Sequence, residues 1–137
     1  MKNRMIAAAV LAAMSAGLVA GTVQARQPKL TGEAKLAQML EGREAGKPVT
    51  CLPLGQSQEA RIIDKTAIVY RFGSTLYVNR PTNPTALDAD DIMVTKTSLS
   101  SLCRLDTVEL HDRTSHFYSG FVGLQDFVPY KKVASAK

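Results

Sequence analysis

The stretch Ala67-Ile-Val-Tyr-Arg-Phe-Gly-Ser-Thr-Leu-Tyr-Val-Asn-Arg80 contains the clearest structural pattern in the chain. Its two arms are rich in β-branched and aromatic residues and are separated by Gly73-Ser74. This pattern predicts a β-hairpin, because glycine readily adopts the backbone angles of a tight turn. Ile68 and Tyr70 fall on one face of the first arm and Val69 on the other, so large apolar groups occupy both faces. We therefore expect the hairpin to lie centrally in a sheet rather than at its edge.

The same two-residue alternation continues on both sides of this hairpin. Val108 and Leu110 alternate with polar neighbours and are expected to point inward. Frequent turn formers separate the segments, which predicts a mainly β fold (α+β at its edge). The expected architecture is a small antiparallel sheet, sandwich or barrel with one N-terminal helix. The expected strands are residues 49–52, 60–63, 67–72, 75–80, 92–96, 106–112, 117–122 and 127–130.

One amphipathic helix is expected before the first strand. The segment from Thr31 to Glu44 contains an apolar stripe at i, i+3 and i+4, formed by Leu36, Met39 and Leu40. The first residue of the segment can cap the helix, and Pro48 prevents its continuation. A stripe this narrow is typical of a helix that packs on one face of a sheet.

The first 25 residues contain the three parts of a cleavable export signal. Lys2 and Arg4 precede an apolar run of 16 residues, Met5 to Ala20. This run is shorter than the roughly 20 apolar residues that a transmembrane helix needs. It is followed by Val23-Gln24-Ala25, a cleavage pattern of small residues. We expect cleavage after residue 25 and a periplasmic or secreted protein without a membrane span.

Without this signal the chain is one small domain of ordinary charge. Residues 26–137 carry 15 basic and 12 acidic side chains, so the formal net charge falls from +5 to +3. We expect a linker and the amphipathic helix over residues 26–47, the β-rich domain over 48–132 and a tail over 133–137. The modest charge, the predicted export and the lack of a basic helix all argue against nucleic-acid binding.

The chain contains two cysteines, Cys51 and Cys103, and both follow the predicted signal. An even pair in a small exported domain predicts a structural disulfide. Two alternatives use the same side chains: a zinc site shared with His111 and His116, or a thiol nucleophile beside one histidine. Neither alternative has the usual local spacing, so the disulfide is favoured.

The acidic cluster Asp88-Ala89-Asp90-Asp91 is the strongest local candidate for a site. Carboxylates of Asp88, Asp90 and Asp91 are the ligand type that Ca²⁺ prefers, but the spacing differs from an EF-hand loop. A solvated turn before a strand is the favoured interpretation. The sequence has no G-x-S-x-G, H-E-x-x-H, S-x-x-K or glycine-rich phosphate motif. We therefore assign no catalytic residue, cofactor or resident metal.

Several segments of the β region resemble a family of small exported proteobacterial proteins of the sphingomonad type, classed as a domain of unknown function. The likeness covers roughly residues 43–131, and it implies a periplasmic β-rich domain with no assigned activity. The segments that carry it are Gly46–Cys51, Ile62–Tyr70, Leu76–Arg80, Leu102–Asp106 and Leu124–Tyr130.

Two functions are compatible with these observations. The favoured one is a non-enzymatic domain that binds a protein or another component of the cell envelope through its sheet or its basic ends. The alternative is a small envelope enzyme or inhibitor whose site combines distant residues, such as His111, His116 and the cluster at Asp88. A pocket that joins two of these groups would favour the alternative.

Overall fold

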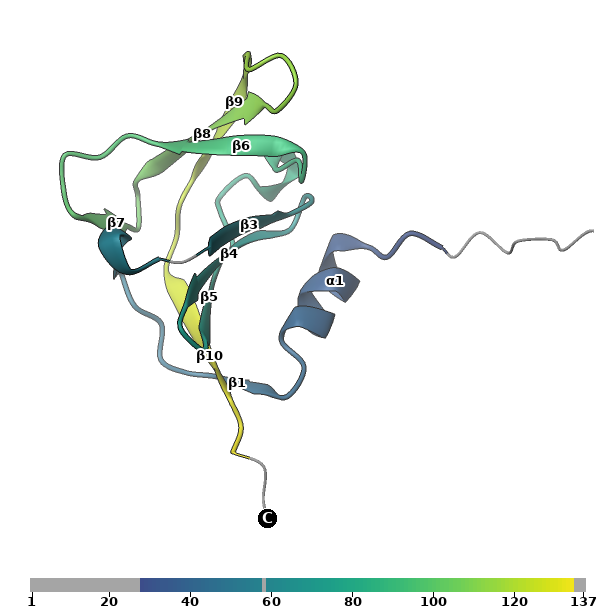
Figure 1. Cartoon of the computed structure of the whole chain (residues 1–137), viewed down its shortest axis with the longest axis vertical. Coiled ribbons are helices and arrows are strands. Elements are labelled where there is room, and N and C mark those ends of the chain that lie inside the picture. The colour runs from purple at the N-terminus through teal and green to yellow at the C-terminus, as the bar shows by residue number, and fades with distance from the viewer. Residues whose placement is uncertain (1–27, 58, 135–137) are drawn as a thin grey trace, which may run out of the picture.

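The computed structural model describes residues 28–57 and 59–134 and is mainly β, with one α-helix and antiparallel sheets (Figure 1). This confirms the predicted fold class. The expected signal peptide, residues 1–25, lies outside the described residues. In chain order the elements are α1 (Gly32–Met39), β1 (Arg43–Ala45), β2 (Cys51–Pro53), the 3-10 helix η1 (Leu54–Gln56), β3 (Glu59–Ile63), β4 (Ala67–Phe72), β5 (Thr75–Asn79), the 3-10 helix η2 (Pro84–Ala86), β6 (Asp91–Thr95), β7 (Ser101–Cys103), β8 (Thr107–Asp112), β9 (Tyr118–Gly123) and β10 (Phe127–Lys132).

The hairpin of β4 and β5 lies inside a five-stranded antiparallel sheet of order β1-β10-β5-β4-β3. Tyr70 lies opposite Tyr77 in its register, and Gly73 turns the chain with a φ of 57°. All of Ala67 to Tyr70 is buried, although successive side chains point to opposite faces. The prediction of a central hairpin is confirmed, because both faces of this sheet are covered.

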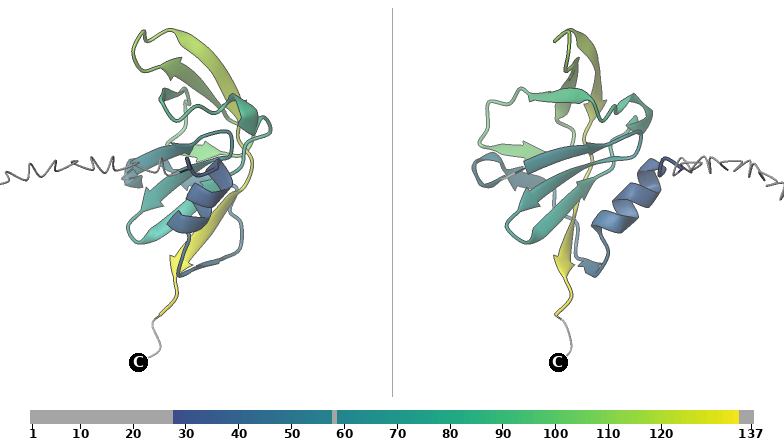
Figure 2. Two further views of the ribbon diagram at one scale, coloured as in Figure 1. Left: turned by 90° about the vertical axis from the view of Figure 1, so that its right-hand side faces the viewer. Right: turned by 45° about the vertical axis from the view of Figure 1, so that its right-hand side comes forward.

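Helix α1 covers one face of the five-stranded sheet (Figure 2). Leu36 is 2% exposed and belongs to an apolar cluster with Val69 and Val78, so the predicted stripe does pack on a sheet. Thr31 caps the helix, because its Oγ1 accepts a hydrogen bond of 3.2 Å from Ala34 N. A Cβ at Gly32 would collide with the turn between β3 and β4, so glycine allows the helix to approach that turn closely.

Two smaller sheets, β2-β7 and β6-β8-β9, enclose the core on the opposite face. Val108 and Leu110 are fully buried there, as the alternation in sequence predicted. Phe127 is also fully buried, and its ring packs edge-on against Tyr70 with centroids 5.8 Å apart. The molecule thus has three layers: a helix, a central sheet, and the two smaller sheets.

A buried asparagine connects the central sheet to the connection between β9 and β10. Asn79 has no exposed surface, and its Nδ2 donates a hydrogen bond to Gln125 O. Gln125 N donates a hydrogen bond of 3.3 Å back to Asn79 Oδ1. Both functional atoms of the amide are therefore paired, which offsets the cost of burying it.

The helix is shorter than predicted. It ends at Met39, and Arg43 and Glu44, which we expected to complete it, belong to strand β1 (Arg43–Ala45) beside β10. Gly42 has a φ of 69° and reverses the chain between the two elements. Pairing with β1 also extends β10 to Lys132, two residues beyond the predicted end. A helical pattern in sequence does not reveal such pairing with a strand almost 90 residues away.

Candidate functional site

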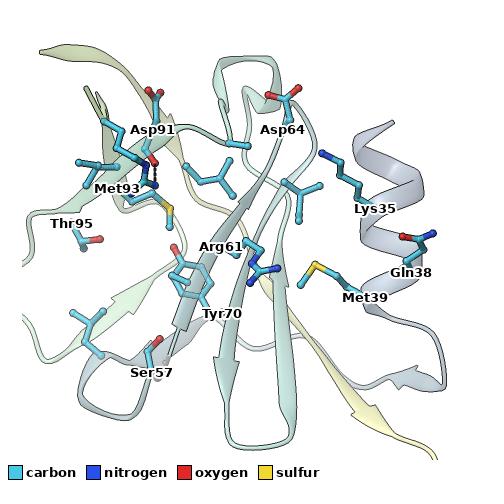
Figure 3. Close-up of a pocket in the computed structure, with 17 residues that line it drawn as sticks. Lys35, Gln38, Met39, Ser57, Arg61, Asp64, Tyr70, Asp91, Met93 and Thr95 are labelled. Atoms are coloured by element: carbon cyan, nitrogen blue, oxygen red, sulfur yellow. Dashed lines mark hydrogen bonds between the residues drawn. The ribbon is translucent and has the colours of Figure 1, made fainter. Parts of the chain in front are cut away.

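A groove of about 970 Å³ lies between β3 and β6 (Figure 3). Helix α1 forms one side of it, β6 forms the other, and β3 runs between them. The main lining residues are Lys35, Gln38 and Met39 of α1, Ala60 to Asp64 of β3 and its turn, Tyr70, Asp91 to Met93 and Thr95 of β6, Leu54, Ser57 and Arg113.

The groove passes around the free edge of β3. The residues Ala60 to Ile63 are consecutive, and all of them line the hollow. Neighbours along a strand face opposite sides of a sheet, so a hollow that contacts all four must include the strand edge. β3 is the last strand of the central sheet, and β6 is the last strand of its own sheet. The groove therefore lies where two sheets end without pairing with each other.

The backbone of β3 has hydrogen-bonding capacity on this edge. Outside its pairing with β4, the only backbone bond of β3 within the described residues runs from Thr66 N to Ile63 O. In an antiparallel pair, alternate residues direct their N–H and C=O groups away from the partner strand. These groups of β3 face the groove and are available to another chain.

The opposite end of the smaller sheet is closed. Strand β9 is also an edge strand, but Asn83 Nδ2 donates a hydrogen bond of 2.8 Å to Phe121 O. Gly123 N donates one of 3.2 Å to Asn83 Oδ1, and Thr82 N donates one of 2.9 Å to Gly123 O. The segment at residues 82–83 thus takes the place of a neighbouring strand beside the second half of β9.

The side of the groove toward β6 is apolar at its base. Ile62 and Tyr70 are buried, and Leu54 and Met93 pack against the same cluster. Burial raises the pKa of the Tyr70 hydroxyl above its ordinary value, so this group is neutral at physiological pH. The hydroxyl makes no side-chain hydrogen bond to another described residue.

The side of the groove toward α1 carries exposed cations. Arg61 Nη2 lies 2.8 Å from Glu59 Oε1, and Arg71 Nε lies 3.7 Å from the other carboxylate oxygen. Lys35 makes no ion pair with a described residue, and Asp64 is the one carboxylate lining this side among those residues. Positive charge therefore exceeds negative charge on this side.

The acidic cluster forms a turn, and its carboxylates have separate surroundings. Asp88 and Asp90 are exposed, and Asp88 Oδ1 accepts a hydrogen bond of 2.9 Å from Asp90 N. Asp91 is 8% exposed, and its Oδ2 accepts a hydrogen bond of 2.8 Å from Ser119 Oγ. Within residues 28–57 and 59–134, no group of three or more His, Cys, Asp and Glu side chains is placed to hold a metal ion.

The two histidines lie on the β8–β9 hairpin, away from the groove. His111 Nδ1 is 3.3 Å from His116 O, and its Nε2 is 3.4 Å from Glu109 Oε2. The ring of His111 also packs edge-on against Tyr118 at 5.8 Å. Neither histidine lines the groove, and of the titratable residues that the enzymatic alternative combined, Asp91 alone does so among the described residues.

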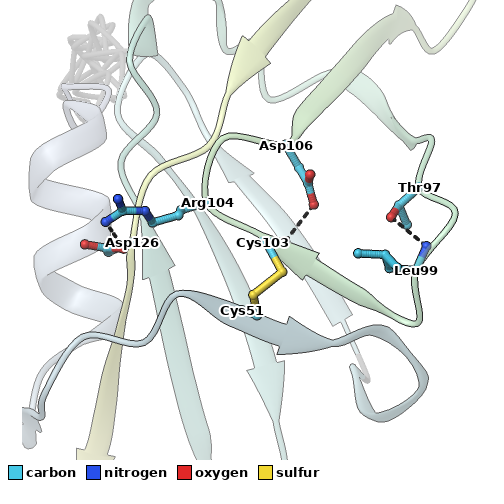
Figure 4. The surroundings of a disulfide bond; sticks show 7 residues. All are labelled: Cys51, Thr97, Leu99, Cys103, Arg104, Asp106 and Asp126. Atoms are coloured by element: carbon cyan, nitrogen blue, oxygen red, sulfur yellow. Dashed lines mark hydrogen bonds and ion pairs between the residues drawn. A yellow bond between two sulfur atoms is a disulfide. The ribbon is translucent and has the colours of Figure 1, made fainter.

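The predicted disulfide between Cys51 and Cys103 is present (Figure 4). It joins β2 to β7 at residues that lie directly opposite each other. The chain continues from β2 into η1, where Leu54 N donates a hydrogen bond of 2.9 Å to Ser100 O. Leu54 lines the groove, so the disulfide holds one end of the groove in place. With both sulfurs bonded, the zinc and thiol alternatives are excluded for this state.

A second hollow, of about 460 Å³, is less suited to a ligand because its cations are already paired. Arg80 forms a two-pronged pair with Glu33, at 2.6 and 3.0 Å. Arg104 Nη1 lies 3.6 Å from Asp126 Oδ1. The larger groove, with an open strand edge, is the better candidate site.

Sequence reasoning did not identify the residues of the groove. Lys35 and Gln38 lie opposite the apolar stripe of the predicted helix, and Arg61 falls within the predicted strand 60–63. The one signal in the sequence that bears on the groove is the hairpin with apolar residues on both faces. Both faces of its sheet must be covered, and the covering elements then flank the neighbouring strand β3. The local sequence pattern does not predict which strands lie at the edges of the sheets.

Among the described residues, no helix is long and apolar enough to cross a membrane. Comparison of the chain with protein-family models, with curated proteins and with solved structures found no match.

Proposed function

We propose that this protein is an exported, non-enzymatic binding domain of the cell envelope, which holds a protein partner in the groove between β3 and β6. The observation that carries the proposal is the coincidence of this groove with a strand edge that pairs with no other strand among the described residues. Edge strands that are left open commonly pair with another chain.

Two observations support export. The N-terminal 25 residues have the composition of a cleavable signal, and the Cys51–Cys103 disulfide is compatible with an oxidising compartment. The resemblance to exported proteobacterial proteins agrees with both. Fractionation of cells that express the full chain, followed by intact-mass measurement, tests this part. We expect a periplasmic or secreted product cut after Ala25 with no reactive thiol, and a cytoplasmic, uncut product would contradict it.

The lining of the groove favours binding over catalysis. Acid–base catalysis needs titratable groups within hydrogen-bond reach of one another in a pocket. Asp91 is held by Ser119, and Arg113 Nη2 donates a hydrogen bond of 3.4 Å to the backbone oxygen of Asp91. The base of the groove is aliphatic and aromatic, and its charges are spread along the rim. An apolar base with a polar rim is the usual arrangement of a binding surface.

Site-specific photo-crosslinking in cells tests the proposal. A benzoylphenylalanine is placed at Thr95 or Gln38, on the two rims of the groove, and at the exposed Lys47 as a control outside the groove. We expect a light-dependent adduct of defined mass from the two groove positions and none from the control. Adducts from the control alone, or none from either groove position, would refute the proposed site.

A further inference from the structure

We infer that the groove accepts an extended polypeptide segment, which adds to the free edge of β3 as a further strand of the central sheet. This inference rests on the proposed function and specifies the partner. The backbone of the segment would bond to β3, and its side chains would fall alternately toward α1 and toward β6.

The backbone of β3 offers hydrogen-bonding groups to a partner. The two faces of the central sheet are covered, so the groups that remain free to bind another chain are the N–H and C=O groups along the outer edge of β3. Ile62 and Ile63 are buried and Glu59 to Arg61 are exposed, so an added strand would give partners to the buried backbone groups and replace water at the exposed ones. β3 has five residues, about 17 Å of extended chain, enough for a segment of similar length.

The contrast with β9 shows that an open edge is not general in this molecule. Hydrogen bonds between β9 and the residues Thr82 and Asn83 cover that edge. The edge of β3 instead carries the charged residues Glu59 and Arg61, which keep edge strands from pairing indiscriminately. An edge that is open but charged suits a selected partner better than a second copy of the same edge.

The two sides of the groove define the chemistry of the segment. Ala60 and Ile62 lie on the face of β3 toward Tyr70 and Met93, an apolar side. Arg61 lies on the other face, toward α1 and the half-buried Lys35. Residues of an added strand alternate in the same way. We therefore expect apolar residues at every second position and at least one acidic residue between them.

The experiment selects linear 12-residue peptides, displayed on phage, on the purified protein. Clones that also bind the variant Ala60→Trp are removed, because the indole fills the apolar side of the groove. Ala45→Trp is the matched control, since Ala45 is an exposed strand alanine outside the groove. We expect enriched peptides with the apolar and acidic alternation, which bind the control variant as well as they bind the wild type.

Backbone methylation of an enriched peptide then distinguishes strand addition from other modes of binding. N-methyl groups at alternate positions remove the N–H donors that face β3, and the other set faces away. We expect one set to weaken affinity about tenfold per methyl and the other about threefold or less. Hydrogen exchange should slow at alternate amides of β3 on binding. This readout leaves the protein sequence unchanged, so it does not depend on whether a variant folds.

Charge is tested by Lys35→Glu, with Lys47→Glu as a control outside the groove. The first should weaken an acidic peptide about tenfold, and the second should leave affinity nearly unchanged.

Enrichment of no peptide, or equal effects of the two methylation sets, would overturn the inference. If these tests fail while groove positions still cross-link in cells, the proposed function stands and only strand addition is refuted. If the groove positions do not cross-link, the proposed function fails as well.

Discussion

The two edge strands β3 and β9 differ in whether another segment of the chain forms hydrogen bonds to their outer edge. β9 is bonded by Thr82 and Asn83, and its neutral sequence from Phe117 to Leu124 includes exposed aromatic side chains. β3 has no such cover within the described residues, but it is charged and lies between two walls. The difference indicates that a neutral, aromatic edge needs another segment of the chain hydrogen-bonded to it, whereas a charged edge can stay open without promoting self-association.

The largest expected effect is a loss of stability that affects the regions of β3 and β9 together. Phe127 is fully buried, contacts Tyr70 and bridges to Val49, so it supports the core behind both edges. Phe127→Ala should lower the free energy of unfolding by about 3–5 kcal/mol, because it leaves a cavity in a small core. Urea denaturation measures this value. A loss below about 1 kcal/mol would show that the two regions do not share this core.

Removal of the disulfide should loosen the end of the groove near β3 more than the region of β9. The double variant Cys51→Ser, Cys103→Ser opens a loop spanning 52 residues and should cost about 2–4 kcal/mol of stability. Hydrogen exchange should accelerate in β2 and η1, at the end of the groove, more than in β9. Equal acceleration in both regions would mean that the disulfide does not act locally. Reduction of the wild-type protein is the matching control.

Removal of the hydrogen bonds that cover β9 would leave its edge unpaired, as in β3, but without charged side chains that oppose self-association. Asn83→Ala removes the hydrogen bond to Phe121 O and the one accepted from Gly123 N, at a cost of about 1 kcal/mol. We expect concentration-dependent self-association in sedimentation velocity, because the freed edge is uncharged. Thr114→Ala, at an exposed turn of the β8–β9 hairpin, should stay monomeric to the same extent as the wild type. A monomeric Asn83→Ala protein would show that these bonds do not protect the edge.

The smallest expected effect concerns the helix that forms one wall of the groove. The hydrogen bond from Arg80 lowers the pKa of Glu33 below its ordinary value of 4.5. The Glu33–Arg80 pair therefore stabilises the fold above pH 4.5, and this contribution is lost as the pH falls through the lowered pKa of Glu33. The pair is exposed, so Glu33→Gln should cost about 1 kcal/mol or less near neutral pH. The difference in unfolding free energy between the two proteins at pH 7 should shrink as the pH falls below 4, and a difference that grows on acidification would contradict this account.

Much of the fold was predictable because its signals are local. The hairpin turn at Gly73, the inward positions Val108 and Leu110 and the cap at Thr31 depend on residues close in sequence. The end of the helix was not predicted, because Arg43 to Ala45 form a strand only through pairing with β10. The candidate site was missed for the same reason, since its lining comes from α1, β3 and β6.

The sequence by itself determined the β-rich class, the central place of the hairpin and the single pair of cysteines. These properties follow from side-chain periodicity and composition, which act over a few residues. Only the tertiary structure decided that β9 would be closed by Asn83 while β3 stayed open beside a groove. Strand order and edge cover depend on contacts between segments distant in sequence, and local pattern does not encode which of them meet.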